Sequence, residues 1–128
     1  MRVLLDTHTF IWWDTTPHHL SEHVRLLCQN ASNQLVLSVA SVWEMAIKIQ
    51  LGKLRLDKPL AAMIGEQQQV NQLEILPIAL SHALAVEALL PIHKDPFDRL
   101  LIAQAQVEGI PLLSRDAIFA NYPIAVVW

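Results

Sequence analysis

Residues Lys94–Ala105, KDPFDRLLIAQA, predict a helix that carries two aspartates at its start. Asp95 suits the N-cap position, and Pro96 suits the first helical position because its φ angle is fixed. Asp98 then falls at N3, near the positive end of the helix dipole. Capping alone would explain both carboxylates. Asp98 also continues an apolar stripe of the helix, however, so we expect its side chain to turn toward the interior.

Outward from this helix, short apolar runs alternate with longer helical patterns along the whole chain. The predicted strands are Val3–Leu5, Leu35–Leu37, Glu74–Ile78, Pro111–Leu113 and Ile124–Val127. The predicted helices are a segment through Phe10–Trp13, then Leu20–Ala31, Val39–Leu51, Pro59 to about Val70, Ser81–Leu90 and Pro96–Glu108. Such alternation predicts an α/β fold with a central, mostly parallel sheet of about five strands and helices on both faces, a three-layer α/β/α sandwich.

The composition is typical of one small domain that spans residues 1–128. No stretch is long and apolar enough to predict a membrane span, and the charge at Asp6 comes too early for a signal peptide. The single cysteine, Cys28, excludes an internal disulfide and is typical of a reducing compartment. We therefore expect a cytoplasmic protein without a membrane partner. The hydrophobic content of 53% would suit either a large core or a surface covered by a partner.

The net charge of -3 and the isoelectric point of about 6.0 are unusual for a protein that binds nucleic acid. This objection weakens if several of the carboxylates hold divalent cations, because the bound ions would offset the negative charge. The overall charge therefore does not decide whether the protein binds nucleic acid.

Acidic residues follow the predicted strands, where functional groups of open α/β sheets collect. Asp6 follows the first strand, Asp116 follows the fourth, and Glu44 lies early in the helix after the second. Each has a structural alternative: Asp6 and Asp116 can cap helical turns, and Glu44 can pair with Lys48 at i,i+4 for a few tenths of a kcal/mol. Together with Asp98, however, they would crowd one edge of the sheet and repel one another unless protons or cations neutralised them.

The ligand types favour Mg²⁺ or Mn²⁺ over zinc, because carboxylates are hard oxygen ligands and the chain has neither a CxxC nor an HExxH motif. We interpret the histidines, His18 and His19 included, as surface or core residues. A carboxylate cluster that holds one or two such ions suits the attack of water on a phosphodiester.

At this point four segments resemble the PIN domain, specifically the VapC-like ribonuclease toxins of type II toxin–antitoxin pairs. The segments are VLLDTHTFIWW, SVWEMAIKIQLGKL, DPFDRLLIAQA and PLLSRDAIF, which carry Asp6, Glu44, Asp98 and Asp116 in that order. The resemblance implies that these four acids are the catalytic residues and the ligands of one or two Mg²⁺ or Mn²⁺ ions. It leaves Asp95 as an N-cap, outside the general quartet.

The resemblance also implies an endoribonuclease that leaves a 5′-phosphate, forms a homodimer and is inhibited by a cognate antitoxin. Thr7 and Ser114 are candidates for supporting hydroxyls, and Ser114 could orient Asp116 or a water molecule. Three basic residues are candidates for contacts with RNA phosphate: Lys48, Arg99 and Arg115. Surface ion pairs are the alternative for all three.

Two other classes of function stay open. A catalytically inactive PIN-like binding subunit would keep the fold but not the geometry of the site. A phospho-receiver signalling domain should carry two acids after its first strand and an acceptor aspartate after its third, whereas Asp6 precedes Thr7 and His8, and Pro77-Ile78 end the third predicted strand. The helices around Trp12, Trp13 and Trp43 could form a dimer surface, an antitoxin groove or core.

Overall fold

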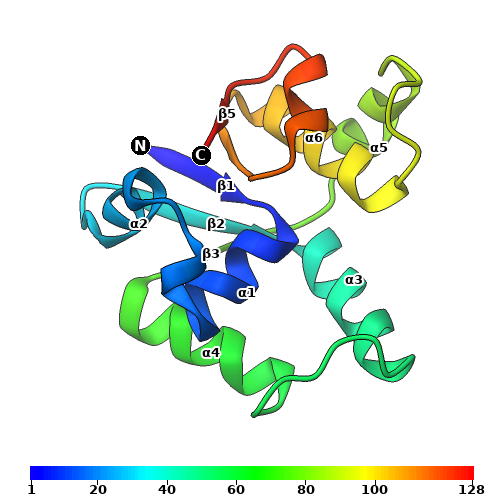
Figure 1. Cartoon of the computed structure of the whole chain (residues 1–128). Coiled ribbons are helices and arrows are strands. Elements are labelled where there is room, and N and C mark those ends of the chain that lie inside the picture. Colours follow the sequence, from blue (N-terminus) through cyan, green and yellow to red (C-terminus); the bar gives the residue numbers. More distant parts are fainter.

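The computed structural model describes residues 1–128 and shows a five-stranded sheet with helices packed on both faces (Figure 1). The strands are β1 (Arg2–Leu5), β2 (Gln34–Ser38), β3 (Glu74–Leu76), β4 (Leu112–Leu113) and β5 (Val126–Val127). They lie in the order β3-β2-β1-β4-β5, and every neighbouring pair is parallel. The predicted α/β/α architecture is confirmed, and the sheet is wholly parallel.

The six α-helices match the predicted segments, with differences at their ends. They are α1 (Thr7–Thr15), α2 (Glu22–Gln29), α3 (Val39–Gln50), α4 (Leu60–Asn71), α5 (Leu80–Glu87) and α6 (Pro96–Glu108). Two short 3₁₀ helices, η1 (Pro17–His19) and η2 (Ala117–Asn121), complete the chain. None of the helices combines the length and the hydropathy needed to cross a lipid bilayer.

Several predicted ends differ by two or three residues: α2 is shorter at both ends, β5 begins at Val126 instead of Ile124, and β3 and α5 end early. β3 ends at Leu76 instead of Ile78, since Pro77 has no N–H to donate to a neighbouring strand. α5 ends at Glu87 instead of Leu90, where the carbonyls of its last turn and of the residues beyond it accept hydrogen bonds from a side chain of α6. The pattern of apolar residues continues past both ends: Leu89 after α5 is buried in the core, whereas Ile78 after β3 is exposed.

Alternate strand residues supply two separate hydrophobic cores. One face of the sheet, with Leu4, packs against α6 and η2, whose side chains Leu101, Ile102 and Phe119 are at most 1% exposed. The other face, with Val3 and Leu5, packs against the layer of α1, α2 and α4, whose buried members are Phe10, Val24 and Met63. Complete burial of each such side chain contributes roughly 1.5–3 kcal/mol, so both helical layers are fixed to the sheet.

The tryptophans divide between these environments. Trp12 and Trp13 are half-buried at the edge of the core beneath α1, whereas the side chain of Trp43 on α3 is 57% exposed and packs on Phe97. Core is therefore the wrong interpretation for Trp43 and only partly right for the other two.

The parallel sheet determines where the site can form. Because all strands run the same way, their carboxyl ends meet at one edge, and α1 and α3 begin directly beyond β1 and β2. α3 packs against both α1 and α6, so it closes one side of this edge. The start of α6 lies at the same edge, which brings residues far apart in sequence together.

Candidate active site

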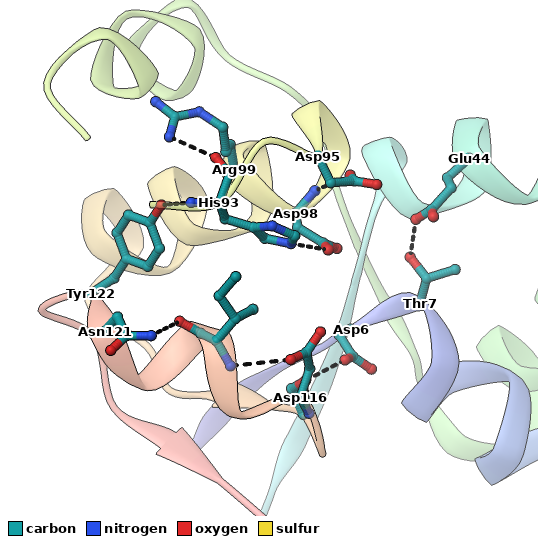
Figure 2. Close-up of polar contacts among 12 residues, drawn as sticks. Asp6, Thr7, Glu44, His93, Asp95, Asp98, Arg99, Asp116, Asn121 and Tyr122 are labelled. Atoms are coloured by element: carbon teal, nitrogen blue, oxygen red, sulfur yellow. Dashed lines mark hydrogen bonds and ion pairs between the residues drawn. The ribbon is translucent and has the colours of Figure 1, made fainter. Parts of the chain in front are cut away.

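A small cavity of about 110 Å³ lies at the carboxyl edge of the sheet, and all four predicted acids line it. Asp6 comes from the end of β1, Glu44 from α3, Asp98 from the start of α6 and Asp116 from the residue before η2 (Figure 2). Asp95 is a fifth carboxylate in the lining, and Lys48 contributes the single lysine. The structure therefore brings together the quartet that the sequence placed in four separate segments.

Asp6 and Asp116 are held by backbone N–H groups and share one serine. Asp6 caps α1: its Oδ1 accepts the N–H of Thr9 at 2.7 Å, and its Oδ2 accepts the hydroxyl of Ser114. The Oγ atom of Ser114 also accepts the N–H of Asp116 at 3.0 Å, while Oδ1 of Asp116 accepts the N–H of Ile118 at 3.1 Å. Burial raises the pKa of the Asp6 carboxyl, although both hydrogen bonds oppose that shift.

Glu44 is buried and held between a hydroxyl and an ammonium group. Its Oε1 accepts the hydroxyl of Thr7 at 2.7 Å, and its Oε2 accepts Nζ of Lys48 at 2.7 Å. The Oγ of Ser41 lies 3.0 Å from the hydroxyl oxygen of Thr7 and supports it. The i,i+4 pair expected as the structural alternative is therefore present. With only 5% of Glu44 exposed, that pair fixes its carboxylate toward the cavity rather than toward solvent.

Asp98 combines the helix-start role with an unfavourable electrostatic position. Asp95 is the N-cap, and its Oδ1 accepts the N–H of Asp98 at 3.0 Å, as predicted. The pKa of the Asp98 carboxyl is raised to about 6 by burial, and the charges of Asp95 and Glu44 raise it further, while a hydrogen bond from His93 opposes the shift. Oδ1 of Asp98 accepts no hydrogen bond from the protein, so it is free for a ligand.

His93 is the site residue that sequence reasoning missed. Its Nε2 lies 2.6 Å from Oδ2 of Asp98, and its backbone N–H donates to the hydroxyl of Tyr122, which donates in turn to the carbonyl of Leu90 (Figure 2). One ligand atom each of His93, Asp98 and Asp116 lies within 4.8 Å of the other two. The available signal was its position five residues before Asp98, on the loop that leads into the motif.

The three basic candidates have different surroundings. Lys48 contacts Glu44 inside the cavity lining. The guanidinium of Arg99 turns away from the acids and donates to the carbonyl of His93 at 3.2 Å (Figure 2). It also donates to the carbonyl of Leu90 at 2.9 Å. This placement explains Arg99 structurally, so we do not carry it into the proposed RNA contacts. Arg115 is exposed beside Asp116 and forms no hydrogen bond or ion pair within the protein.

The site fits a divalent cation by its donor chemistry. Five carboxylates line the cavity with one lysine, so most of the negative charge lacks a protein counter-charge. Burial raises the pKa of Asp6 and Asp98, and for Asp98 the charges of Asp95 and Glu44 add to the shift, so negative charge is costly at this site. Carboxylate oxygens with at most one imidazole are the ligands that Mg²⁺ and Mn²⁺ prefer.

The model of the PIN domain family matches residues 3–125, which is nearly the whole chain. This chain is a PIN domain. Among curated proteins it is similar to Ribonuclease VapC16 of Mycobacterium tuberculosis, with 34% identity over 59 residues. That match covers 46% of the PIN domain described here and 40% of the relative, so it spans less than half the length of either protein.

Solved structures show the same fold at low sequence identity. The PIN domain aligns with a chain of DNA-bound VapBC from Salmonella typhimurium over 99% of its own length and 97% of that chain, with TM-score 0.70 and 18% identity. It aligns with a chain of VapBC2 from Rickettsia felis, bound to a promoter DNA fragment, over 99% and 98%, with TM-score 0.68 and 16% identity. Family membership argues against the phospho-receiver alternative.

Proposed function

We propose that this PIN domain is a metal-dependent endoribonuclease that acts as the toxin of a type II toxin–antitoxin pair. The single observation that carries the proposal is the meeting of Asp6, Glu44, Asp98 and Asp116 in one cavity of a PIN-domain chain. The similarity to a ribonuclease of the VapC group supports RNA as the substrate. A catalytically inactive binding subunit would have no need to keep four converging carboxylates that share a single lysine.

In this proposal the four carboxylates hold one or two Mg²⁺ or Mn²⁺ ions, with His93 beside Asp98. The ion would lower the pKa of the attacking water and stabilise negative charge on the leaving oxygen. The protein's own hydrogen bonds set the ligand directions: Thr7 orients Glu44, and Ser114 orients Asp6. Oδ1 of Asp98 and Oδ2 of Asp116 have no protein donor, so they are the oxygens most available to the ion.

Two supporting residues hold the loop that carries His93. Tyr122 fixes the loop that carries His93, and Arg99 donates to carbonyls of the same loop. Because the hydrogen bonds of Tyr122 and Arg99 tie this loop down, we infer that it is prearranged. Prearranged groups accelerate reactions because no reorganisation is needed when charge develops.

Partners and location belong to the same proposal. Structural neighbours of this fold are named as VapBC complexes, which supports a cognate antitoxin as the partner of this chain. We further propose that the protein forms a homodimer. We also propose a cytoplasmic location, in line with the single cysteine. An antitoxin segment that covered the acidic cavity would block access of RNA to it.

The proposal is tested by expression of the chain in bacteria with and without the neighbouring open reading frame. We expect growth arrest that the neighbour relieves, and metal-dependent appearance of RNA fragments with 5′-phosphate ends in lysates and with purified protein. Purified protein that leaves all RNA intact with Mg²⁺ or Mn²⁺, together with normal growth of the expressing cells, would overturn the proposed function.

A further inference from the structure

A second hollow of about 250 Å³ adjoins the acidic cavity on the side of α1. Five residues line it: Asp6, His8, Trp12, Arg115 and Asp116. Asp6, His8 and Asp116 line both spaces, so a group in this hollow lies directly beside the candidate metal ligands. The volume is slightly below the range of roughly 300–1,000 Å³ for complete small-molecule pockets, so the hollow fits part of a ligand.

One wall of this hollow is a braced aromatic surface. The ring of His8 lies 5.9 Å from that of Trp12, one turn along α1. Behind it, the indole of Trp12 meets His19 edge-on at 5.7 Å and Trp128 at 6.0 Å. These contacts hold the indole in place, and Trp12 is still partly exposed and lines the hollow. Such fixed rings are suited to stacking with planar groups.

The lining of this hollow also includes a cation without a partner inside the protein. Lys48 is engaged by Glu44 and Arg99 by backbone carbonyls, but Arg115 has no partner within the chain. A guanidinium group binds phosphate oxygens through two parallel hydrogen bonds. Next to the carboxylates, it offers a site for an anion that the acids alone would repel.

We propose that this hollow is a nucleotide subsite that takes the unpaired base of an RNA nucleotide next to the scissile phosphate. The base stacks on His8 and Trp12, and Arg115 holds a neighbouring phosphate. This proposal rests on the proposed function and assigns the contact with one unpaired base to His8 and Trp12, because bases inside a duplex cannot offer their faces to aromatic side chains. The sugar that joins base and phosphate is flexible, so the base can stack on His8 and Trp12 while Arg115 binds the phosphate.

The test uses a short RNA with a mapped cleavage position and a set of copies that each carry one abasic nucleotide. With wild-type protein, we expect the abasic nucleotide at the position next to the cut to lower kcat/KM by roughly 5- to 150-fold, the range for loss of one base–aromatic stack. His8→Ala and Trp12→Leu should cleave the intact RNA more slowly and respond less to the abasic nucleotide. Trp43→Leu, at an exposed tryptophan outside the hollow, is the matched control and should respond like wild type.

Two further measurements keep this proposal separate from the proposed function. His8 and Arg115 are exposed, so His8→Ala and Arg115→Gln should fold even if Trp12→Leu does not. Binding of the same RNAs to Asp98→Asn, followed by fluorescence anisotropy, needs no turnover and should show the same preference for an intact base. If the variants are as sensitive to the abasic nucleotide as the wild type, in cleavage or in binding, the subsite proposal is overturned. The proposed nuclease function is then unaffected. Loss of all cleavage by the wild type, with base-dependent binding through His8, would overturn the nuclease alone.

Discussion

Acidic side chains have opposite electrostatic surroundings at the two ends of the parallel strands, the amino edge and the carboxyl edge of the sheet. At the amino edge, Arg2 binds both oxygens of Glu74 and reaches Glu108 at 3.5 Å, and the buried His82 lies 3.1 Å from the other oxygen of Glu108. These partners, His82 first, lower the pKa of Glu108. At the carboxyl edge, burial and neighbouring acids raise the pKa of Asp98 to about 6.

This difference teaches how stability and function are divided in a small fold. An acid with a lowered pKa is stabilised in its charged form by the folded protein, so it favours folding at neutral pH. An acid with a raised pKa is held in its charged form at a cost, and such sites are candidates for function. The predictions below compare Asp98 with Glu108 because both lie on α6, at its two ends.

The largest expected difference is in RNA cleavage. Asp98→Asn should lower the rate with Mg²⁺ or Mn²⁺ by about 10²-fold or more, because the amide removes a ligand charge where negative charge develops. Glu108→Gln makes the same chemical change at the other end of α6 and should leave kcat essentially unchanged. Steady-state cleavage of a labelled RNA measures both. Equal losses in the two variants would mean that the edges do not differ in function.

Next in size is the effect of divalent ions on stability. At ten times its dissociation constant, Mg²⁺ or Mn²⁺ should stabilise the wild type by about 1.4 kcal/mol, or about 5 °C in Tm. The shift should be larger at pH 7.5 than at pH 5, and Asp98→Asn should reduce it. Calorimetric melting in metal-free and metal-containing buffer measures this.

The direction of this pH dependence follows from the pKa of Asp98. It is about 6 in the folded protein, above the ordinary 3.8, so the unfolded chain loses this proton first as pH rises. Because of this carboxyl, the free energy of unfolding of the metal-free protein falls as the pH rises from about 4 to about 6, and it stays lower above that range. At pH 5 protons compete with the ion. A thermal shift that is equal at the two pH values would contradict a role for Asp98 as a ligand.

A smaller effect is expected on the stability of the metal-free protein, and here the order of the two variants is reversed: Glu108→Gln should be the more harmful change. Glu108→Gln should lower the free energy of unfolding by about 1 kcal/mol at pH 7.5, because the neutral amide weakens the hydrogen bonds with Arg2 and His82. Asp98→Asn should leave it unchanged or raise it, since it removes a charge that burial disfavours. Urea denaturation in the presence of EDTA measures both values. A loss of stability in Asp98→Asn equal to that in Glu108→Gln would remove the distinction.

The smallest expected effect concerns Arg99, which lies near the acidic cavity but binds loop carbonyls instead of the acids. Arg99→Gln should lower the free energy of unfolding by about 1 kcal/mol through lost hydrogen bonds to the loop carbonyls. It should leave the salt dependence of RNA binding unchanged, whereas Arg115→Gln should reduce the salt slope by about one. Binding at several salt concentrations measures this. A reduced slope for Arg99→Gln would return Arg99 to the RNA surface.

Much of the fold could be predicted because its signals are local. Continuous apolar runs such as Val3–Leu5 indicate strands buried on both faces, and Asp95-Pro96 marks the start of α6 to the residue. The end of β3 was missed because the apolar Ile78 continues the strand pattern in the sequence, although it lies exposed in the following loop. The exposure of Trp43 depends on where α3 lies over the sheet edge, which no local pattern contains.

The sequence indicated the four acids and the supporting hydroxyls of Thr7 and Ser114, but it did not indicate His93. Carboxyl ends of parallel strands meet by topology, so the order of strands and helices along the chain was enough to bring Asp6 and Asp116 together. His93 could not be placed in this way, because the loop that carries it is positioned by Tyr122, a contact between residues 29 apart in sequence. Similarly, the lack of any partner for Arg115, and the engagement of Arg99, depend on tertiary geometry.

The central claim is that the four carboxylates at the carboxyl edge form a divalent-cation site. Diffraction from crystals grown with Mn²⁺, recorded near the manganese absorption edge, tests it most directly. We predict an anomalous peak in the cavity between Asp6, Glu44, Asp98 and Asp116, which is absent in Asp98→Asn and retained in Glu108→Gln. An empty cavity in wild-type crystals at saturating Mn²⁺, or a peak only at another place on the molecule, would contradict the account.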